Sequence, residues 1–312
     1  MAYIHTLDDV CRVLLIMNPA SGMFQSKAGM YDIVSIFSKS GCVPTTLMTA
    51  KAGDATEFVR RYAETHDIVV CCGGDGTLNE VITGMMQCKR RIPIGLIPLG
   101  TTNDVARTLH IPIGNVKKAV KALVASDNVH HDVGMFGKER FFTYIASFGA
   151  FTKVSYQTPR WKKNMFGHVA YLMDSIPALG DIRPWDMDIS CDVLEERGSY
   201  AFGCVSNATS IAGIVKLDPE RVSFNDGKFE VMLIRHPRTL NDVERILDAL
   251  VKQKFNESIN GGPPYVRFFR TDKITVTPHE SMPWTVDGEY GGAPEKVEIK
   301  NKHGAVEILR KV

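Results

Sequence analysis

Residues 69–81 read VVCCGGDGTLNEV, an apolar run that passes through three glycines and an aspartate into a helical pattern over 78–86. Gly73, Gly74 and Gly76 allow backbone conformations and close approaches that a side chain would block. A helix that begins after such a loop points the positive end of its dipole at the loop, which favours an anion. The stretch therefore predicts a strand, a phosphate-binding loop and a helix, although a plain turn would use the same residue types.

The same alternation of strand and helix fills the first third of the chain. We expect strands at 12–19, 45–48, 67–72 and 94–98, and helices at 26–39, 54–64, 78–86 and 104–109. Alternation of this kind is typical of an α/β fold with a doubly wound parallel sheet, whose sites lie at the carboxyl ends of the strands.

After residue 131 the pattern changes to short strand-like runs that are separated by turn residues. These runs are 141–147, 201–208, 228–234, 273–278 and 296–300. One amphipathic helix is expected at about 240–251. The pattern indicates an antiparallel β-rich domain. We place an α/β domain at 1–131 and the β-rich domain at 132–301, and leave open which of them the final strand, 302–312, joins.

The amino-acid composition argues against several classes of protein. The 312 residues include 37 Lys plus Arg against 35 Asp plus Glu, a net charge of +2, which argues against a dedicated nucleic-acid binder. No run approaches the ~20 apolar residues that span a bilayer. The seven cysteines lack the paired spacing of a disulfide framework or a zinc site. We therefore expect a cytoplasmic globular protein.

Two further polar loops follow predicted strands. NPASG occupies 18–22, after the first strand, and PLGTTND occupies 98–104, after the fourth. All three loops are expected at one edge of the sheet, where they would form a nucleotide-binding crevice. Asp75 would repel phosphate oxygens unless a magnesium ion lies between them or the carboxylate orients a hydroxyl.

Segments 18–22, 73–80 and 98–107, in this order and spacing, resemble the diacylglycerol kinase catalytic domain. The resemblance continues through 156–171, Asn225-Asp226-Gly227 and Asp287-Gly288-Glu289, and is greatest to the soluble bacterial lipid kinases. It implies a nucleotide-binding domain like that of phosphofructokinases and NAD kinases, followed by an antiparallel β-sandwich-like domain that handles the lipid.

The resemblance also implies roles for individual residues. Its ATP contacts map to Asn18, Pro19, Ala20, Ser21, Gly22, Thr49, Gly73, Gly74, Asp75, Gly76, Thr77, Leu78, Asn79 and Thr101. Glu289 is similar to the family's proton acceptor. Asp75 and Asp104 are further catalytic candidates, which help to organise the magnesium ion bound to ATP.

A structural magnesium site is implied at Asp226, with the backbone carbonyls of Ser223 and Lys228 as further ligands. Many relatives carry an apolar or aromatic residue in place of Lys228, and Phe in place of Val105. The Asp-Gly pair before Glu289 is also a strong hairpin signal, so a plain turn is the alternative interpretation of that motif.

The leading hypothesis is an ATP-dependent lipid kinase that uses Mg²⁺ and converts diacylglycerol to phosphatidic acid. A sphingoid base, ceramide, phosphatidylglycerol or a polyprenol would be alternative acceptors. An NAD kinase-like enzyme and a non-catalytic lipid or nucleotide sensor are the competing classes. The expected partners are ATP and a lipid at the membrane surface, without nucleic acid, and a homodimer is left open. Residues 160–166 combine basic and large apolar residues, as a membrane-interfacial segment or a solvated helix end would.

Overall fold

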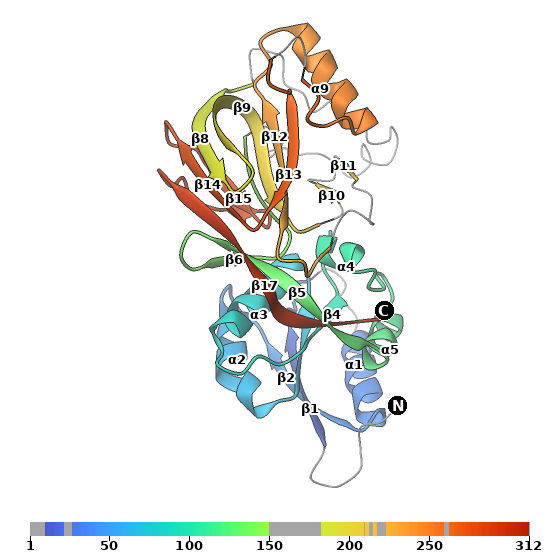
Figure 1. The fold of residues 1–312 in the computed structure, drawn as a ribbon. Helices are drawn as coiled ribbons and strands as arrows, with labels where there is room; N and C mark the ends of the chain where they lie inside the picture. The colour runs from blue at the N-terminus through green and yellow to red at the C-terminus, as the bar shows by residue number, and fades with distance from the viewer. Residues whose placement is uncertain are drawn as a thin grey trace. The chain divides into compact units, whose positions relative to one another are not determined.

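The computed structural model describes residues 10–21, 27–149, 182–208, 210–211, 215–216, 223–258 and 262–311, and it divides into two compact units. Unit 1 comprises Met1–Val133 and His303–Val312, and unit 2 comprises Gly134–Lys302 (Figure 1). Within the described ranges no helix is long and apolar enough to cross a membrane. Gly22 and the segment 156–171, with its basic and aromatic residues, lie outside these ranges.

Unit 1 is built on a parallel sheet. Its strands are β1 (Cys11–Met17), β2 (Cys42–Met48), β3 (Ile68–Gly73) and β4 (Ile94–Pro98), in the order β4-β3-β1-β2. The end of β17 (Val297–Arg310) adds to the free side of β4 through Ile308, again in parallel. The residues after the four parallel strands therefore meet at one edge, as the alternating pattern predicts.

Helices cover both faces of this sheet. They are α1 (Lys27–Lys39), α2 (Asp54–Tyr62), the 3₁₀ turn η1 (Ala63–Thr65), α3 (Asp75–Gln87), α4 (Asp104–Thr108) and α5 (Val116–Val124). Helices α1 and α5 pack together on one face, and α2 and α3 pack together on the other (Figure 1). Leu15 and Val70 of the sheet bury against Phe37 of α1 and Val120 of α5.

Unit 2 is an antiparallel β structure. Its strands are β5 (Asp127–Phe136), which begins in unit 1, β6 (Arg140–Phe142), β7 (Ile145–Gly149), β8 (Trp185–Cys191), β9 (Glu195–Ser206), β10 (Ser210–Ile211), β11 (Val215–Lys216), β12 (Phe229–Arg235), β13 (Val266–Thr271), β14 (Lys273–Pro278), β15 (Trp284–Val286) and β16 (Glu289–Tyr290). Neighbours run β16-β15-β7-β9-β8-β14-β17, and β12 pairs with both β9 and β13.

One helix, α9 (Leu240–Lys252), packs on unit 2. Thr239 and Asp242 form a capping box at its start, which satisfies backbone N–H groups that the first turn would leave without partners. Ile246 and Leu250 of the helix bury with Met232 and Val266 of the sheet. A second core gathers aromatic side chains, including Trp284 and Phe148 with ring centroids 5.0 Å apart.

The structure confirms the α/β class of the first part and the antiparallel β class of the second, and corrects several boundaries. Helix α3 begins at Asp75, three residues before the expected start, so the Gly-rich loop ends in its first turn. The expected strand 141–147 is two strands, β6 and β7. The final residues continue β17 as one long strand, and their last part, from His303, belongs to unit 1.

Candidate functional site

The loop after β1 is tied to the Gly-rich loop after β3. The Asn18 side-chain amide donates a hydrogen bond to Thr77 Oγ1 at 3.0 Å, and the Asn18 backbone N–H donates to the carbonyl of Cys72 at 3.0 Å. Asn18 Oδ1 accepts the N–H of Ala20, and the Ser21 N–H donates to the carbonyl of Asn18. The two predicted phosphate-binding loops are therefore held together at the carboxyl edge of the sheet.

The third loop packs against the glycines. The Leu99 N–H donates to the carbonyl of Gly73 at 2.8 Å. A Cβ atom on Gly74 would lie 3.0 Å from Gly100 Cα, and one on Gly100 would lie 2.5 Å from Gly74 Cα. A Cβ on Gly73 would lie 2.6 Å from Thr77 Oγ1. The backbones of the two loops come this close only because both residues lack side chains.

Asp75 connects the Gly-rich loop to α4. Its two carboxylate oxygens accept the backbone N–H groups of Asp104 at 3.1 Å and Val105 at 3.2 Å, in the first turn of that helix. Asn103 precedes α4 in a left-handed conformation (φ 52°) and exchanges two hydrogen bonds with Gly100. These contacts explain why an aspartate stands in an anion-binding loop. Its role toward the ATP-bound magnesium stays a prediction.

The other predicted nucleotide contacts differ in exposure. Pro19, Ala20, Gly76 and Thr101 are exposed, whereas the Leu78 side chain is buried in the core. Any contact of Leu78 with a nucleotide is therefore through its backbone. Thr49 follows β2, and its N–H donates to the carbonyl of Met17 at 2.9 Å, at the same sheet edge. Asn79 is half-buried in α3.

In unit 2 the Asp-Gly-Glu motif forms a hairpin. Val286 pairs with Glu289 across β15 and β16, and the two turn residues, Asp287 (φ 46°) and Gly288 (φ 86°), are both left-handed. This is the turn that an Asp-Gly pair favours between two strands. The Asp-Gly turn is therefore present and places Glu289 on an edge strand, and the role of Glu289 as proton acceptor stays a prediction.

Asp287 anchors this hairpin to the rest of unit 2. Its carboxylate accepts backbone N–H groups from Thr143 at 2.8 Å, Tyr144 at 3.0 Å and Ile145 at 2.9 Å. The expected strand 141–147 is split at this point because the N–H groups of these residues turn to the carboxylate. The Glu289 side chain itself is 76% exposed and lies 3.8 Å from the guanidinium of Arg140.

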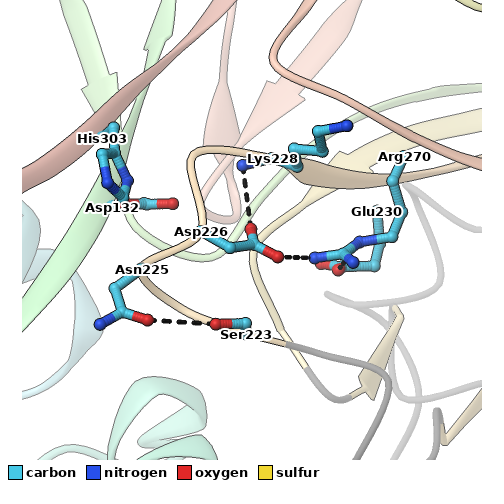
Figure 2. Close-up of polar contacts among 8 residues, drawn as sticks. All are labelled: Asp132, Ser223, Asn225, Asp226, Lys228, Glu230, Arg270 and His303. Atoms are coloured by element: carbon cyan, nitrogen blue, oxygen red, sulfur yellow. Dashed lines mark hydrogen bonds and ion pairs between the residues drawn. The ribbon is translucent and has the colours of Figure 1, made fainter.

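The Asn225-Asp226-Gly227 segment lies beside an arginine (Figure 2). The Lys228 N–H donates to Asp226 Oδ1 at 3.0 Å, and the Arg270 guanidinium pairs with Asp226 Oδ2. Arg270 Nε also lies 3.3 Å from a carboxylate oxygen of Glu230, which has no exposed surface. Burial raises the pKa of Glu230 to about 8, and Arg270 opposes that rise.

The Asp226 carboxylate is engaged by groups that would compete with the structural magnesium ion that the resemblance implies at Ser223, Asp226 and Lys228, and that site, with two backbone carbonyls as further ligands, stays a prediction. One Asp226 oxygen already accepts an N–H and the other faces a guanidinium, while the Ser223 hydroxyl donates to Asn225 Oδ1 at 3.1 Å. The positive charge beside Asp226 belongs to Arg270.

The strand register of unit 2 places Glu230 level with the Glu289 hairpin, but three strands away from it in the sheet. Ser206 of β9 pairs with Glu230 on one side and with Ile145 on the other, and the Asp287 N–H donates to the carbonyl of Ile145. The sequence analysis did not identify Arg270 or Glu230. Glu230 could have been noticed, because it is a charged residue inside the apolar run FEVMLI, and a carboxylate within a buried strand requires a partner.

Comparison with known proteins identifies the family. Residues 12–136 match the model of the diacylglycerol kinase catalytic domain, and residues 145–310 match a YegS C-terminal NAD kinase beta sandwich-like domain. A Bacillus subtilis protein named diacylglycerol kinase is 31% identical over 282 residues, 90% of each chain. The chain belongs to the diacylglycerol kinase family.

Further members of the diacylglycerol kinase family agree with this assignment. A Staphylococcus carnosus diacylglycerol kinase is 32% identical, covering 90% of this chain and 89% of that protein. Two Bacillus anthracis structures described as diacylglycerol kinases have TM-scores of 0.77 and 0.72, at 22% and 20% identity, over 96% of this chain and 97% of theirs. The structures support the shared fold, and the sequence matches show that the chain is a lipid kinase.

Proposed function

We propose that this lipid kinase transfers the γ-phosphate of ATP to the hydroxyl of diacylglycerol and so forms phosphatidic acid. The observation that carries the proposal is the joining of three loops at one sheet edge by Asn18, Thr77 and Asp75. The N-terminus of α3 adds the positive end of a 13-residue helix. Backbone N–H groups and a helix dipole together favour the phosphates of a nucleotide.

In the proposed reaction the lipid hydroxyl oxygen forms a bond to the γ-phosphorus, and the bond from that phosphorus to the bridging oxygen of ADP breaks. The hydroxyl proton passes to the carboxylate of Glu289, which a hairpin anchored by Asp287 presents on an edge strand. A magnesium ion bound to ATP would offset the phosphate charge. Asp75 and Asp104 are the candidates that orient the nucleotide and its metal.

The acceptor lipid is inferred from relatives, because the Bacillus subtilis and Staphylococcus carnosus proteins, 31% and 32% identical, are named diacylglycerol kinases. A sphingoid base, ceramide, phosphatidylglycerol and a polyprenol are the competing acceptors. Membership of this family weighs against an NAD kinase-like enzyme and against a sensor without activity. We further propose that the enzyme works at the cytoplasmic membrane surface, where Trp161 and Phe166 would contact lipid.

Radiolabelled ATP offered with a panel of purified lipids tests the acceptor. The label is expected in phosphatidic acid, and labelling of another lipid in preference to diacylglycerol would replace the proposed substrate. The Glu289→Gln variant tests the proton acceptor, since glutamine keeps the size but takes no proton. We expect kcat to fall by roughly 10²–10⁴-fold with ATP affinity unchanged. Wild-type turnover in this variant would exclude Glu289 from the role.

A further inference from the structure

Unit 2 contains a cavity of about 680 Å³ at the start of α9. Gly198 and Ser199 of β9 line it, whereas the Glu289 hairpin neighbours the opposite end of that strand, at Ser206. Ser199 and Ser206 are seven positions apart on this extended strand, which corresponds to about 23 Å. The cavity is therefore distinct from the hairpin and from the ion pairs of Arg270.

Positive charge dominates the cavity wall. Its lining includes four arginines, Arg197, Arg235, Arg238 and Arg245, with His236 and His279, against two aspartates. One of the aspartates, Asp242, is already engaged, because it accepts the backbone N–H groups of Arg238 and Thr239 and the hydroxyl of Tyr265. The Tyr265 hydrogen bond is the main cause that lowers the pKa of Asp242.

Two of the arginines have a carboxylate partner within unit 2, although Glu196 is shared with Arg267. Arg235 pairs with Glu196, and Arg197 lies 3.8 Å from Asp188. Arg238 and Arg245 differ, since no carboxylate among the described residues lies within ion-pairing distance of either side chain. Arg238 is exposed and precedes the N-cap residue of α9, Thr239, whereas Arg245 is half-buried within the helix.

The surroundings of these two arginines favour an anion. A guanidinium removed in part from water gains most from a partner that accepts several hydrogen bonds, as carboxylate and phosphate oxygens do. The volume lies in the range of about 300–1,000 Å³ that small-molecule sites occupy, so it accommodates more than a single ion.

We propose that this cavity is a second ligand site, which binds a phosphate group through Arg238 and Arg245. The phosphate can belong to a soluble metabolite or to the headgroup of an anionic phospholipid, and the chemistry of recognition is the same for both. The inference is independent of the kinase reaction, because none of the residues assigned to ATP or to proton transfer lines the cavity.

The test compares the wild type with the double variant Arg238→Gln/Arg245→Gln at low ionic strength. The matched control is Lys252→Gln/Lys254→Gln, which removes the same charge from the other end of α9 and the residues that follow it. Calorimetric titration with inorganic phosphate is expected to show saturable binding to the wild type and the control. In the arginine variant the affinity should fall at least about tenfold, since charge-assisted hydrogen bonds are lost.

Sedimentation with phosphatidylcholine vesicles, with and without phosphatidylserine, distinguishes the sources. If the arginine variant alone loses binding to phosphatidylserine vesicles, the ligand is a lipid headgroup; if phosphate binding falls while vesicle binding does not change, the ligand is soluble. The proposal is overturned if the wild type binds no phosphate, or if the lysine control loses as much affinity as the arginine variant. Urea unfolding of all three proteins checks that the variants are folded.

Discussion

Arg270 lies directly opposite Glu230 across the antiparallel strands β12 and β13, with its Nε 3.3 Å from a carboxylate that has no exposed surface. The same guanidinium pairs with Asp226 (Figure 2). One arginine thus compensates two acidic groups, and one of these is without contact to water. Removal of the arginine would leave a buried carboxylate without its counter-ion.

We therefore expect Arg270→Met to lower the free energy of unfolding by about 3–5 kcal/mol at about pH 9, where Glu230, whose pKa burial raises to about 8, is ionised. Arg183→Met is the control, because Arg183 pairs with an exposed carboxylate, Glu280, at 2.8 Å. Exposed pairs contribute at most about 1 kcal/mol. Urea unfolding measures both variants, and an equal, small loss in the two would contradict the burial argument.

The effect of magnesium on thermal stability gives a second test of the contact between Arg270 and Asp226. Because Arg270 supplies the charge beside Asp226, the thermal stability of the nucleotide-free protein should be the same in magnesium and in a chelator. An ion bound only by the folded state would raise the melting temperature by mass action. If magnesium raises the melting temperature of the wild type but not of Asp226→Asn, the metal site that the resemblance implies is supported. That result would contradict the view that Arg270 takes the place of the metal ion.

The close approach of two glycines predicts the effect of a side chain in the Gly-rich loop. In Gly74→Val the Cβ would lie 3.0 Å from Gly100 Cα, so the loops after β3 and β4 must separate. We expect the KM for ATP to rise at least about tenfold, equivalent to about 1.4 kcal/mol of binding. Gly114→Ala is the control for backbone strain without a steric contact, since Gly114 has a left-handed φ of 83° and its Cβ would contact nothing within 4 Å. An unchanged KM for ATP in the valine variant would contradict the assignment of the ATP site to this loop.

The sequence predicts this edge of the sheet well because every part of it is local. Glycines, hydroxyl residues and the strand-to-helix alternation are all visible within a few residues of one another. The start of α3 was misplaced because Asp75-Gly76-Thr77 has the composition of a loop, although Asp75 suits the first turn of a helix. Its bonds to Asp104 and Val105 also required the neighbouring strand order, which the loop itself does not encode.

Contacts between residues that lie far apart in the chain could not be predicted from the sequence. Glu230 and Arg270 meet only because β12 and β13 pair in one register, and a shift by one residue would turn each side chain to the opposite face. The same holds for Asp287, whose carboxylate binds N–H groups of residues 143–145. The apolar run 141–147 therefore gave no indication of its break.

His131 predicts a dependence of stability on pH. His131 is a buried residue of β5. Desolvation lowers its pKa from 6.5 to about 4; Asp132 opposes this shift, and Arg310 adds to it. The unfolded chain binds a proton near pH 6.5, whereas the folded chain does so only near pH 4. The contribution of His131 to the free energy of unfolding is therefore fully present above pH 6.5. It is lost as the pH falls toward 4, and amounts to roughly 3 kcal/mol in total.

Urea unfolding at a series of pH values measures this contribution. In His131→Gln the contribution is absent, so the difference between wild type and variant should shrink as the pH falls from 6.5. Each pH unit corresponds to about 1.4 kcal/mol for one proton. Parallel curves for the two proteins would show that His131 titrates alike in the folded and unfolded states.

Asp287 and Glu289 lie two residues apart in one hairpin and are predicted to respond differently to the same chemical change. Asp287 accepts three backbone N–H groups, so Asp287→Asn should destabilise unit 2 by about 1–3 kcal/mol and lower both kcat and the melting temperature. Glu289 is exposed on the edge strand, so Glu289→Gln should lower kcat while the melting temperature stays within the error of the wild type. Each variant thus serves as the control for the other. If Glu289→Gln also lowered the melting temperature, the loss of turnover would be attributed to the hairpin's structure and the proton-acceptor role would lose its support.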